Sequence, residues 1–234
     1  RNTQSVIANQ QQNPIALQVG GSEYDDLKLC SKLAYELSYD EINLNVGCPS
    51  KAVQKGSFGA CLMQDKKLVR NCLEAMQINK NIEVSIKCRI GLGKDFNYDF
   101  FEDFIDEILK SGVKLIYIHA RNAILTGISP KGNRNIPPLN YDFVSKIKSR
   151  YPDITFILNG GINSIEEALK LSKKHDEHMK KYGSDNQLRM TGAHETSSYD
   201  KFSFGRANRG CSVRIPNTVI EDKKGQRTYF STTY

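Results

Sequence analysis

Hydrophobic and polar positions along the first 171 residues follow two alternating patterns. Short apolar runs are each followed by a longer stretch in which apolar residues recur at helical spacing. The short runs predict strands at residues 15–19, 41–46, 83–88, 115–119 and 155–158. The periodic stretches predict helices at residues 22–38, 66–78, 98–110 and 141–150, and from residue 165 onward, with Ser22 capping the first. Such alternation predicts an α/β fold of parallel strands joined by right-handed crossovers.

Polar or glycine-bearing residues follow nearly every predicted strand. They are Gly20-Gly21, Gly47-Cys48, Lys87-Cys88-Arg89, His119-Ala120-Arg121 and Asn159-Gly160-Gly161. In a (β/α) barrel the carboxyl ends of the strands gather on one face, which carries the active site. We therefore expect part of a TIM-type barrel enzyme, in which these side chains converge: Gln18, Cys48, Lys87, His119 and Asn159. A doubly wound sheet is the competing architecture, although no Gly-x-Gly-x-x-Gly follows the first strand.

Cys48 is a candidate for chemistry because of its position. It lies between Gly47, which permits unusual backbone angles, and Pro49, which fixes φ and ends the strand. A thiol in a glycine-rich loop at the end of a strand suits an active site, and a small buried hydrophobe is the alternative. Nearby, Lys87 could hold negative charge and His119 could donate a hydrogen bond to a ring oxygen.

Composition narrows the class of protein. A hydrophobic content of 39% and a charged content of 25% are typical of a soluble globular chain. We expect no membrane span and no signal peptide, because no apolar run approaches the required length. The six cysteines form no CxxC pair and no zinc-ligand spacing with the four histidines. We therefore expect no metal site and a reducing, cytoplasmic environment.

The net charge of +7 is unevenly distributed, with most of the excess after residue 172. Before that point, one segment stands out because it has no acidic residue between Glu107 and Asp142. Its basic residues are Lys110, Lys114, Arg121, Lys131 and Arg134. Such a segment could follow a phosphate backbone, or it could be a solvated basic loop.

The motif Asn45–Ser50 resembles the signature of the tRNA-dihydrouridine synthases. Four further motifs match that family in the same order: Val53–Met63, Ile86–Gly91, His119–Arg121 and Asn159–Ile162. The stretch Leu125–Leu139 resembles the A-type subgroup in particular. The resemblance covers about residues 14–171.

This resemblance implies an enzyme that binds FMN, reduces a uridine of tRNA to dihydrouridine and uses NADPH to recharge the flavin. Cys48 would be the general acid that delivers a proton to C5 of the uracil. Flavin contacts are implied for Gln18, Lys87, His119, Asn159, Gly160 and Gly161. Contacts to the substrate base or to tRNA are implied for Asn45, Arg89, Arg121, Lys131 and Arg134.

The pattern changes from about residue 172. The stretches Arg189–Ser198 and Ala207–Pro216 resemble the C-terminal catalytic part of eukaryotic-type glutamine synthetase, an ATP-dependent ligase. That resemblance implies that Arg189 meets the glutamate carboxylate and that Glu195 guards the intermediate. It also implies that Arg209 and Arg214 stabilise nucleotide phosphates.

The two resemblances predict a chimeric chain. Residues 1–171 would form a partial FMN-binding barrel, and residues 172–234 an α+β fragment of glutamine synthetase type. Five strands cannot close an eight-stranded barrel, so we expect open edges on both sides and a chain that is inactive alone. The alternatives are a non-catalytic tRNA-binding remnant and a ligase fragment. The sequence does not indicate an oligomeric state.

Overall fold

The computed structural model describes residues 14–50, 54, 57–164 and 166–173 with their side chains. It also describes the backbone of residues 189–191, 211–214, 216–221 and 227–231. The strands of the main alternating part are β1 (Ala16–Val19), β2 (Glu41–Val46), β3 (Glu83–Arg89), β4 (Leu115–His119) and β5 (Thr155–Asn159). Its α-helices are α1 (Tyr24–Glu36), α3 (Lys66–Met76), α4 (Tyr98–Leu109) and α5 (Tyr141–Arg150). Two 3-10 helices, η3 (Gly59–Gln64) and η4 (Gly132–Arg134), lie in the connections.

Every strand and helix predicted between residues 15 and 159 is present, and residues 166–173 are helical as expected. The prediction that Ser22 caps the first helix was wrong. The N-cap of α1 is Glu23, which makes no side-chain capping hydrogen bond. The later helices begin at residues whose side chains accept a backbone N–H from the first turn, namely Asp65, Asn97 and Asn140.

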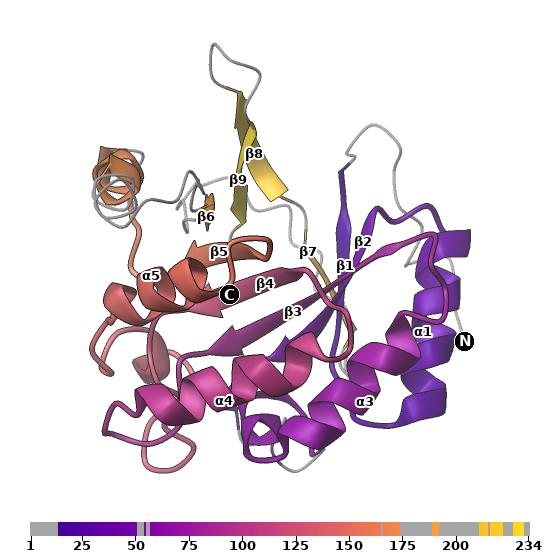
Figure 1. The fold of residues 1–234 in the computed structure, drawn as a ribbon, viewed down its shortest axis with the longest axis horizontal. Helices are drawn as coiled ribbons and strands as arrows, with labels where there is room; N and C mark the ends of the chain where they lie inside the picture. The colour runs from indigo at the N-terminus through magenta and orange to yellow at the C-terminus, as the bar shows by residue number, and fades with distance from the viewer. Residues whose placement is uncertain are drawn as a thin grey trace.

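The sheet follows the order of the chain. Strands β1 to β5 pair in sequence, and each pair is parallel. A doubly wound sheet would reverse its strand order and place helices on both faces. Here the order does not reverse, and right-handed crossovers place the helices on one face (Figure 1). This is the arrangement of a partial (β/α) barrel.

Both edges of the five-stranded sheet are paired by later strands. β6 (Arg189–Thr191) runs parallel to β5, and β7 (Cys211–Arg214) runs antiparallel to β1. The expectation of open edges on both sides was therefore wrong. The physical reason is that an edge strand presents unpaired N–H and C=O groups to any strand within reach. β8 (Pro216–Glu221) and β9 (Arg227–Ser231) form a separate two-stranded antiparallel sheet.

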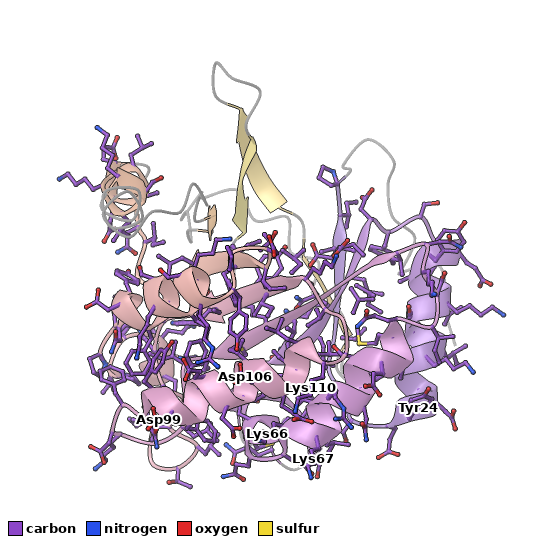
Figure 2. All side chains as sticks on the ribbon, in the orientation of Figure 1. Tyr24, Lys66, Lys67, Asp99, Asp106 and Lys110 are labelled. Atoms are coloured by element: carbon purple, nitrogen blue, oxygen red, sulfur yellow. The ribbon has the colours of Figure 1, made fainter. Side chains whose placement is uncertain are left out.

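The hydrophobic core lies between the sheet and the helices. Alternate residues of the strands are fully buried there, such as Leu44, Ile86 and Ile118, and they pack with α4 residues such as Phe101 and Phe104. Neighbouring helices contact each other, α1 with α3 and α3 with α4 (Figure 1). Their outer surface is charged, as Lys66 and Lys67 on α3, Asp106 on α4 and Lys110 at the C-cap of α4 illustrate (Figure 2). This helical layer packs against one face of the sheet.

Candidate functional site

The face of the sheet opposite the helices carries polar side chains. In β2, residues Glu41, Asn43 and Asn45 alternate with buried apolar residues, so they point away from the core. Strand register aligns Gln18 with Asn43, Asn45 with Lys87, Arg89 with His119, and His119 with Asn159. Paired residues share a face, so the sheet brings together six predicted site residues: Gln18, Asn45, Lys87, Arg89, His119 and Asn159. We call this surface the polar face.

Cys48 lies two residues beyond the end of β2 and is partly exposed. The backbone N–H groups of Gly47 and Cys48 both donate to Asn45 Oδ1, each at 3.1 Å. The Cys48 carbonyl accepts a hydrogen bond of 2.9 Å from the Ala60 N–H, at the start of η3. Gln54 Nε2 donates to the Pro49 carbonyl at 2.8 Å and to the Leu125 carbonyl, in the connection after β4, at 2.9 Å. The thiol is therefore held by backbone contacts beside the polar face.

Arg89 lies in the interior, where it binds main-chain carbonyls. Only 4% of it is exposed, and its guanidinium donates to the Gly47 carbonyl at 3.1 Å and the Asn133 carbonyl at 2.9 Å. Burial lowers its pKa to about 10; the proximity of Cys48 opposes this, and Arg121 and Arg134 add to it. Arg89 thus fastens the cysteine loop to the connection after β4. Its predicted contact with substrate stays a prediction.

Arg121 has a similar structural setting. It is 9% exposed and donates to the carbonyls of Pro137 and Asn135, the latter at 3.4 Å. Burial lowers its pKa as well. The connection after β4 is therefore built around two buried cations that hold its backbone.

The predicted tRNA-contacting residues Lys131 and Arg134 lie in that connection, next to η4. Lys131 is exposed and Arg134 is partly exposed. Between them, the buried Asn133 bonds to both the N–H and the carbonyl of Ile124, at 2.7 and 2.9 Å. The basic segment is thus an ordered loop that presents these two cations near its surface.

His119 ends β4 and is partly exposed, but one of its ring nitrogens lacks a hydrogen-bond partner among the described residues. This nitrogen, Nε2, is buried. Burial is the largest cause that holds its pKa well below the usual value, and the nearby cations Arg89, Lys87 and Arg121 add to the shift. The imidazole is therefore neutral near pH 7 and able to donate or accept a hydrogen bond.

The two glycines after β5 allow the chain to pass close to His119. Gly160 has a φ of +105°, and a Cβ there would lie 2.6 Å from His119 Cδ2. Gly161 has a φ of +70°, and a Cβ there would lie 2.4 Å from a Leu139 methyl group. The Gly160 carbonyl accepts a 2.7 Å hydrogen bond from the Tyr141 hydroxyl. Only glycine fits at this turn, which lets the backbone at Gly160 pass close to the imidazole.

Four polar-face residues were missed in the sequence: Glu41, Asn43, Ser85 and Tyr117. They extend the predicted set toward the amino ends of the strands, and they are hydrogen-bonded to one another. A signal for them existed, because residues 41–46 and 83–89 alternate strictly between polar and apolar positions. The interpretation of residues 42–46 as one apolar run concealed it.

Within the described part of the chain, no helix is long and apolar enough to cross a membrane. The same residues contain no cluster of histidine, cysteine and carboxylate side chains suited to a metal ion.

Comparison with known proteins places the chain in a family. The profile described as Dihydrouridine synthase (Dus) matches residues 1–193. The chain belongs to this family. The match extends beyond residue 171, where the sequence analysis ended the resemblance. The boundary between residues 1–171 and 172–234 was predicted from motifs alone, and it stays a prediction.

Relatives within the family are named tRNA-dihydrouridine(20/20a) synthases. The Shewanella oneidensis protein is 51% identical over 160 residues, which cover 68% of this chain and 48% of the relative. The Vibrio vulnificus protein is 48% identical over 172 residues, which cover 73% of this chain and 52% of the relative. The Escherichia coli K12 protein is 48% identical over 230 residues, which cover 94% of this chain and 64% of the relative. This chain thus spans about half the length of the first two relatives.

Solved structures of similar shape share little sequence with it. For example, 3-dehydroquinate dehydratase from Geobacillus kaustophilus has a TM-score of 0.46 at 13% identity, covering 77% of this chain and 62% of that one.

The resemblance of the tail to glutamine synthetase stays a prediction, because the relatives named above are all dihydrouridine synthases. Arg189 begins β6 and Arg214 ends β7, where the backbone alone is described. Glu195 and Arg209 lie outside the described residues.

Proposed function

We propose that this dihydrouridine synthase reduces uridine in tRNA to dihydrouridine with bound FMN, and that NADPH recharges the flavin. The observation that carries the proposal is the position of Cys48, which is partly exposed and fixed beside a polar face that bears Lys87 and His119. The names of the relatives support positions 20 and 20a as the modified sites.

The polar face fits an anionic flavin nucleotide. The buried His119 Nε2 lacks a partner among the described residues, and a group that accepts a hydrogen bond would satisfy it. The cations around His119 favour negative charge, since they help to lower its pKa. Gly160 and Gly161 leave no side chain in the way of a close approach.

The residues that would hold FMN are those predicted from the sequence: Gln18, Lys87, His119, Asn159, Gly160 and Gly161. When bound, FMN would supply the hydride that reduces the uracil ring.

Cys48 would provide the proton. The thiol holds its proton until negative charge develops on the ring, and it releases the proton to C5 when that atom lies within reach. Asn45 fixes the backbone on either side of Gly47, so the Cβ that carries the thiol keeps its place while the substrate enters. Arg89 ties the same loop to the connection after β4, which limits its movement further.

The basic loop would contact the tRNA. A uridine must leave the base stack to reach a flavin on the polar face, and a surrounding rim of cations would stabilise the distorted RNA. Lys131 and Arg134 present positive charge near the surface, whereas Arg121 shapes the loop from inside. Binding should therefore weaken steeply as salt concentration rises.

The test separates flavin binding from proton delivery. The visible absorption spectrum of the purified chain should show flavin bands that bleach on addition of NADPH. Cys48→Ala should keep the bands and the bleaching, and should lose uridine reduction by at least about a hundredfold, the usual contribution of a general acid. Dihydrouridine would be measured by mass spectrometry of digested tRNA.

Cys61→Ala is the matched control. Cys61 is another partly exposed thiol on the next segment, and its Sγ contacts the Phe58 carbonyl at 3.1 Å. Its loss should leave turnover within about twofold of the wild type. Two results would refute the proposal: a folded, colourless wild-type chain, or full turnover by Cys48→Ala.

A further inference from the structure

A chain of hydrogen bonds runs along the polar face away from the Cys48 loop. It starts at Asn45, whose Oδ1 accepts the N–H groups of Gly47 and Cys48. Asn45 Nδ2 donates to Gln18 Oε1 at 3.3 Å. Gln18 Nε2 donates in turn to Asn43 Oδ1 at 2.6 Å. Three side-chain amides on two strands are thus linked in series.

The chain continues to a carboxylate at the other end of β2. Asn43 Nδ2 donates to Ser85 Oγ at 2.6 Å, and Ser85 Oγ donates to Glu41 Oε1. Glu41 Oε2 accepts a second hydrogen bond, of 3.0 Å, from the Tyr117 hydroxyl. Glu41 therefore ends a series of side chains that begins at the cysteine loop.

All the hydrogen bonds in this series point in one direction. At one end the partners are backbone N–H groups, which can only donate, so Asn45 must present its oxygen to them. Its nitrogen must then donate to the next amide, and the same reasoning passes along the series. At the other end Ser85 Oγ donates its one proton to Glu41, so it must accept from Asn43 Nδ2. The two ends thus require the same orientation of every amide between them.

The middle of the series is shielded from water. Gln18, Asn43 and Ser85 are 3%, 4% and 0% exposed, so solvent cannot replace a hydrogen bond that is lost there. Burial raises the pKa of Glu41, and its hydrogen bonds from Ser85 and Tyr117 oppose that rise by stabilising the charged form. A partly buried carboxylate with two donors needs a reason to be present, since an apolar side chain would avoid the desolvation.

We propose that Glu41 is a positioning residue for Cys48. As the terminal acceptor, its carboxylate fixes the orientation of the three side-chain amides, and the last of these, Asn45, holds the Cys48 backbone. This inference rests on the proposed role of Cys48 as the general acid. Its test requires neither flavin nor tRNA, so the two proposals fail separately.

The test measures how fast iodoacetamide alkylates each cysteine of the folded chain, by peptide mass spectrometry. Glu41→Leu keeps the size of the side chain and removes the acceptor. Cys48 should then react about fivefold faster, the factor that corresponds to one net hydrogen bond, because its loop opens more often. Glu41→Gln retains an acceptor and should stay within about twofold of the wild type.

Glu83→Leu is the matched control. Glu83 is an exposed acid on β3 and is directly paired with Glu41. Its replacement should leave the alkylation rate of Cys48 unchanged. The buried Cys72 and Cys88 report on the fold, because they become reactive only when the chain unfolds. If Glu41→Leu exposes them, Ser85→Ala breaks the same series further along and should give the same fivefold effect.

A double-variant cycle distinguishes transmission through the series from a general loosening. If Glu41 acts through Asn45, then Glu41→Leu should have no further effect on Cys48 in an Asn45→Ala background. Independent, additive effects would overturn the proposal, as would an unchanged Cys48 rate in Glu41→Leu. In turnover, Glu41→Leu should lower kcat and leave KM for tRNA unchanged. Absence of uridine reduction in the wild type, with the expected alkylation pattern, would refute the proposed function alone.

Discussion

The two faces of the sheet are built from the same five strands and have opposite chemistry. On one face, alternate residues such as Ile42, Leu44 and Ile86 are fully buried beneath the helices. On the other, their sequence neighbours Asn43, Asn45 and Lys87 form the polar face. One residue along a strand separates a position that stabilises the fold from a position that serves the site.

The difference shows how a buried polar surface is kept stable. The apolar face contributes the free energy of burial, whereas the polar face must satisfy each donor and acceptor with a specific partner. Gln18 and Asn43 do so through side chains on neighbouring strands. The polar face therefore depends on strand register far more than the apolar face does.

The largest effect should come from the apolar face. Ile86→Ala removes a fully buried side chain and should lower the free energy of unfolding by about 2–5 kcal/mol, measured by urea denaturation. The adjacent Lys87→Met, on the polar face, should change stability by less than about 1 kcal/mol and weaken FMN binding about tenfold. Equal losses of stability in both variants would contradict the division into two faces.

A smaller effect is expected where the backbone meets the polar face. Gly160→Ala should cost about 1–3 kcal/mol, because its φ is positive and the new Cβ would clash with His119. Gly93→Ala is the control, since Gly93 has a φ of +84° and open space around the added Cβ. Thermal unfolding of both variants would isolate the clash. A loss no greater for Gly160→Ala than for Gly93→Ala would show that His119 simply moves aside.

The smallest effect concerns protonation of His119. Its pKa is lower in the folded chain than in the unfolded chain, so it contributes stability above about pH 6.5 that is lost as the pH falls. Between about pH 7.5 and pH 5.5, the wild type should lose about 1 kcal/mol more stability than His119→Gln. Urea titrations at each pH would measure the free energy of unfolding of both proteins. The other three histidines are present in both, so their contributions cancel in the difference. Parallel curves for the two proteins would exclude this contribution.

The strands and helices could be predicted from the sequence because the local pattern of apolar and polar residues determines them. The apolar positions of β2 and the turn residues at its ends predicted the bounds Glu41–Val46 that the structure has. The same patterns predicted that Lys87, His119 and Asn159 share a face, because parallel strands place their carboxyl ends together.

Contacts that depend on distant residues were not predictable in this way. The hydrogen bond from the Arg89 guanidinium to the Asn133 carbonyl, 44 residues away, was not predicted, because no local pattern encodes that distance. The pairing of β7 with β1 was missed for the same reason, because nothing near either segment specifies the other. The partners of Asn43 likewise depend on register across three strands.

The sequential order of β1 to β5 has a consequence for how the chain folds. Each strand pairs with the next one along the chain, so each pairing closes a loop made only of the connection between those two strands. Short loops close at a low entropic cost, and parallel sheets whose strands pair out of order fold more slowly. During synthesis, each new strand and helix can therefore dock onto the unit that left the ribosome before it. The sheet can grow in the direction of translation.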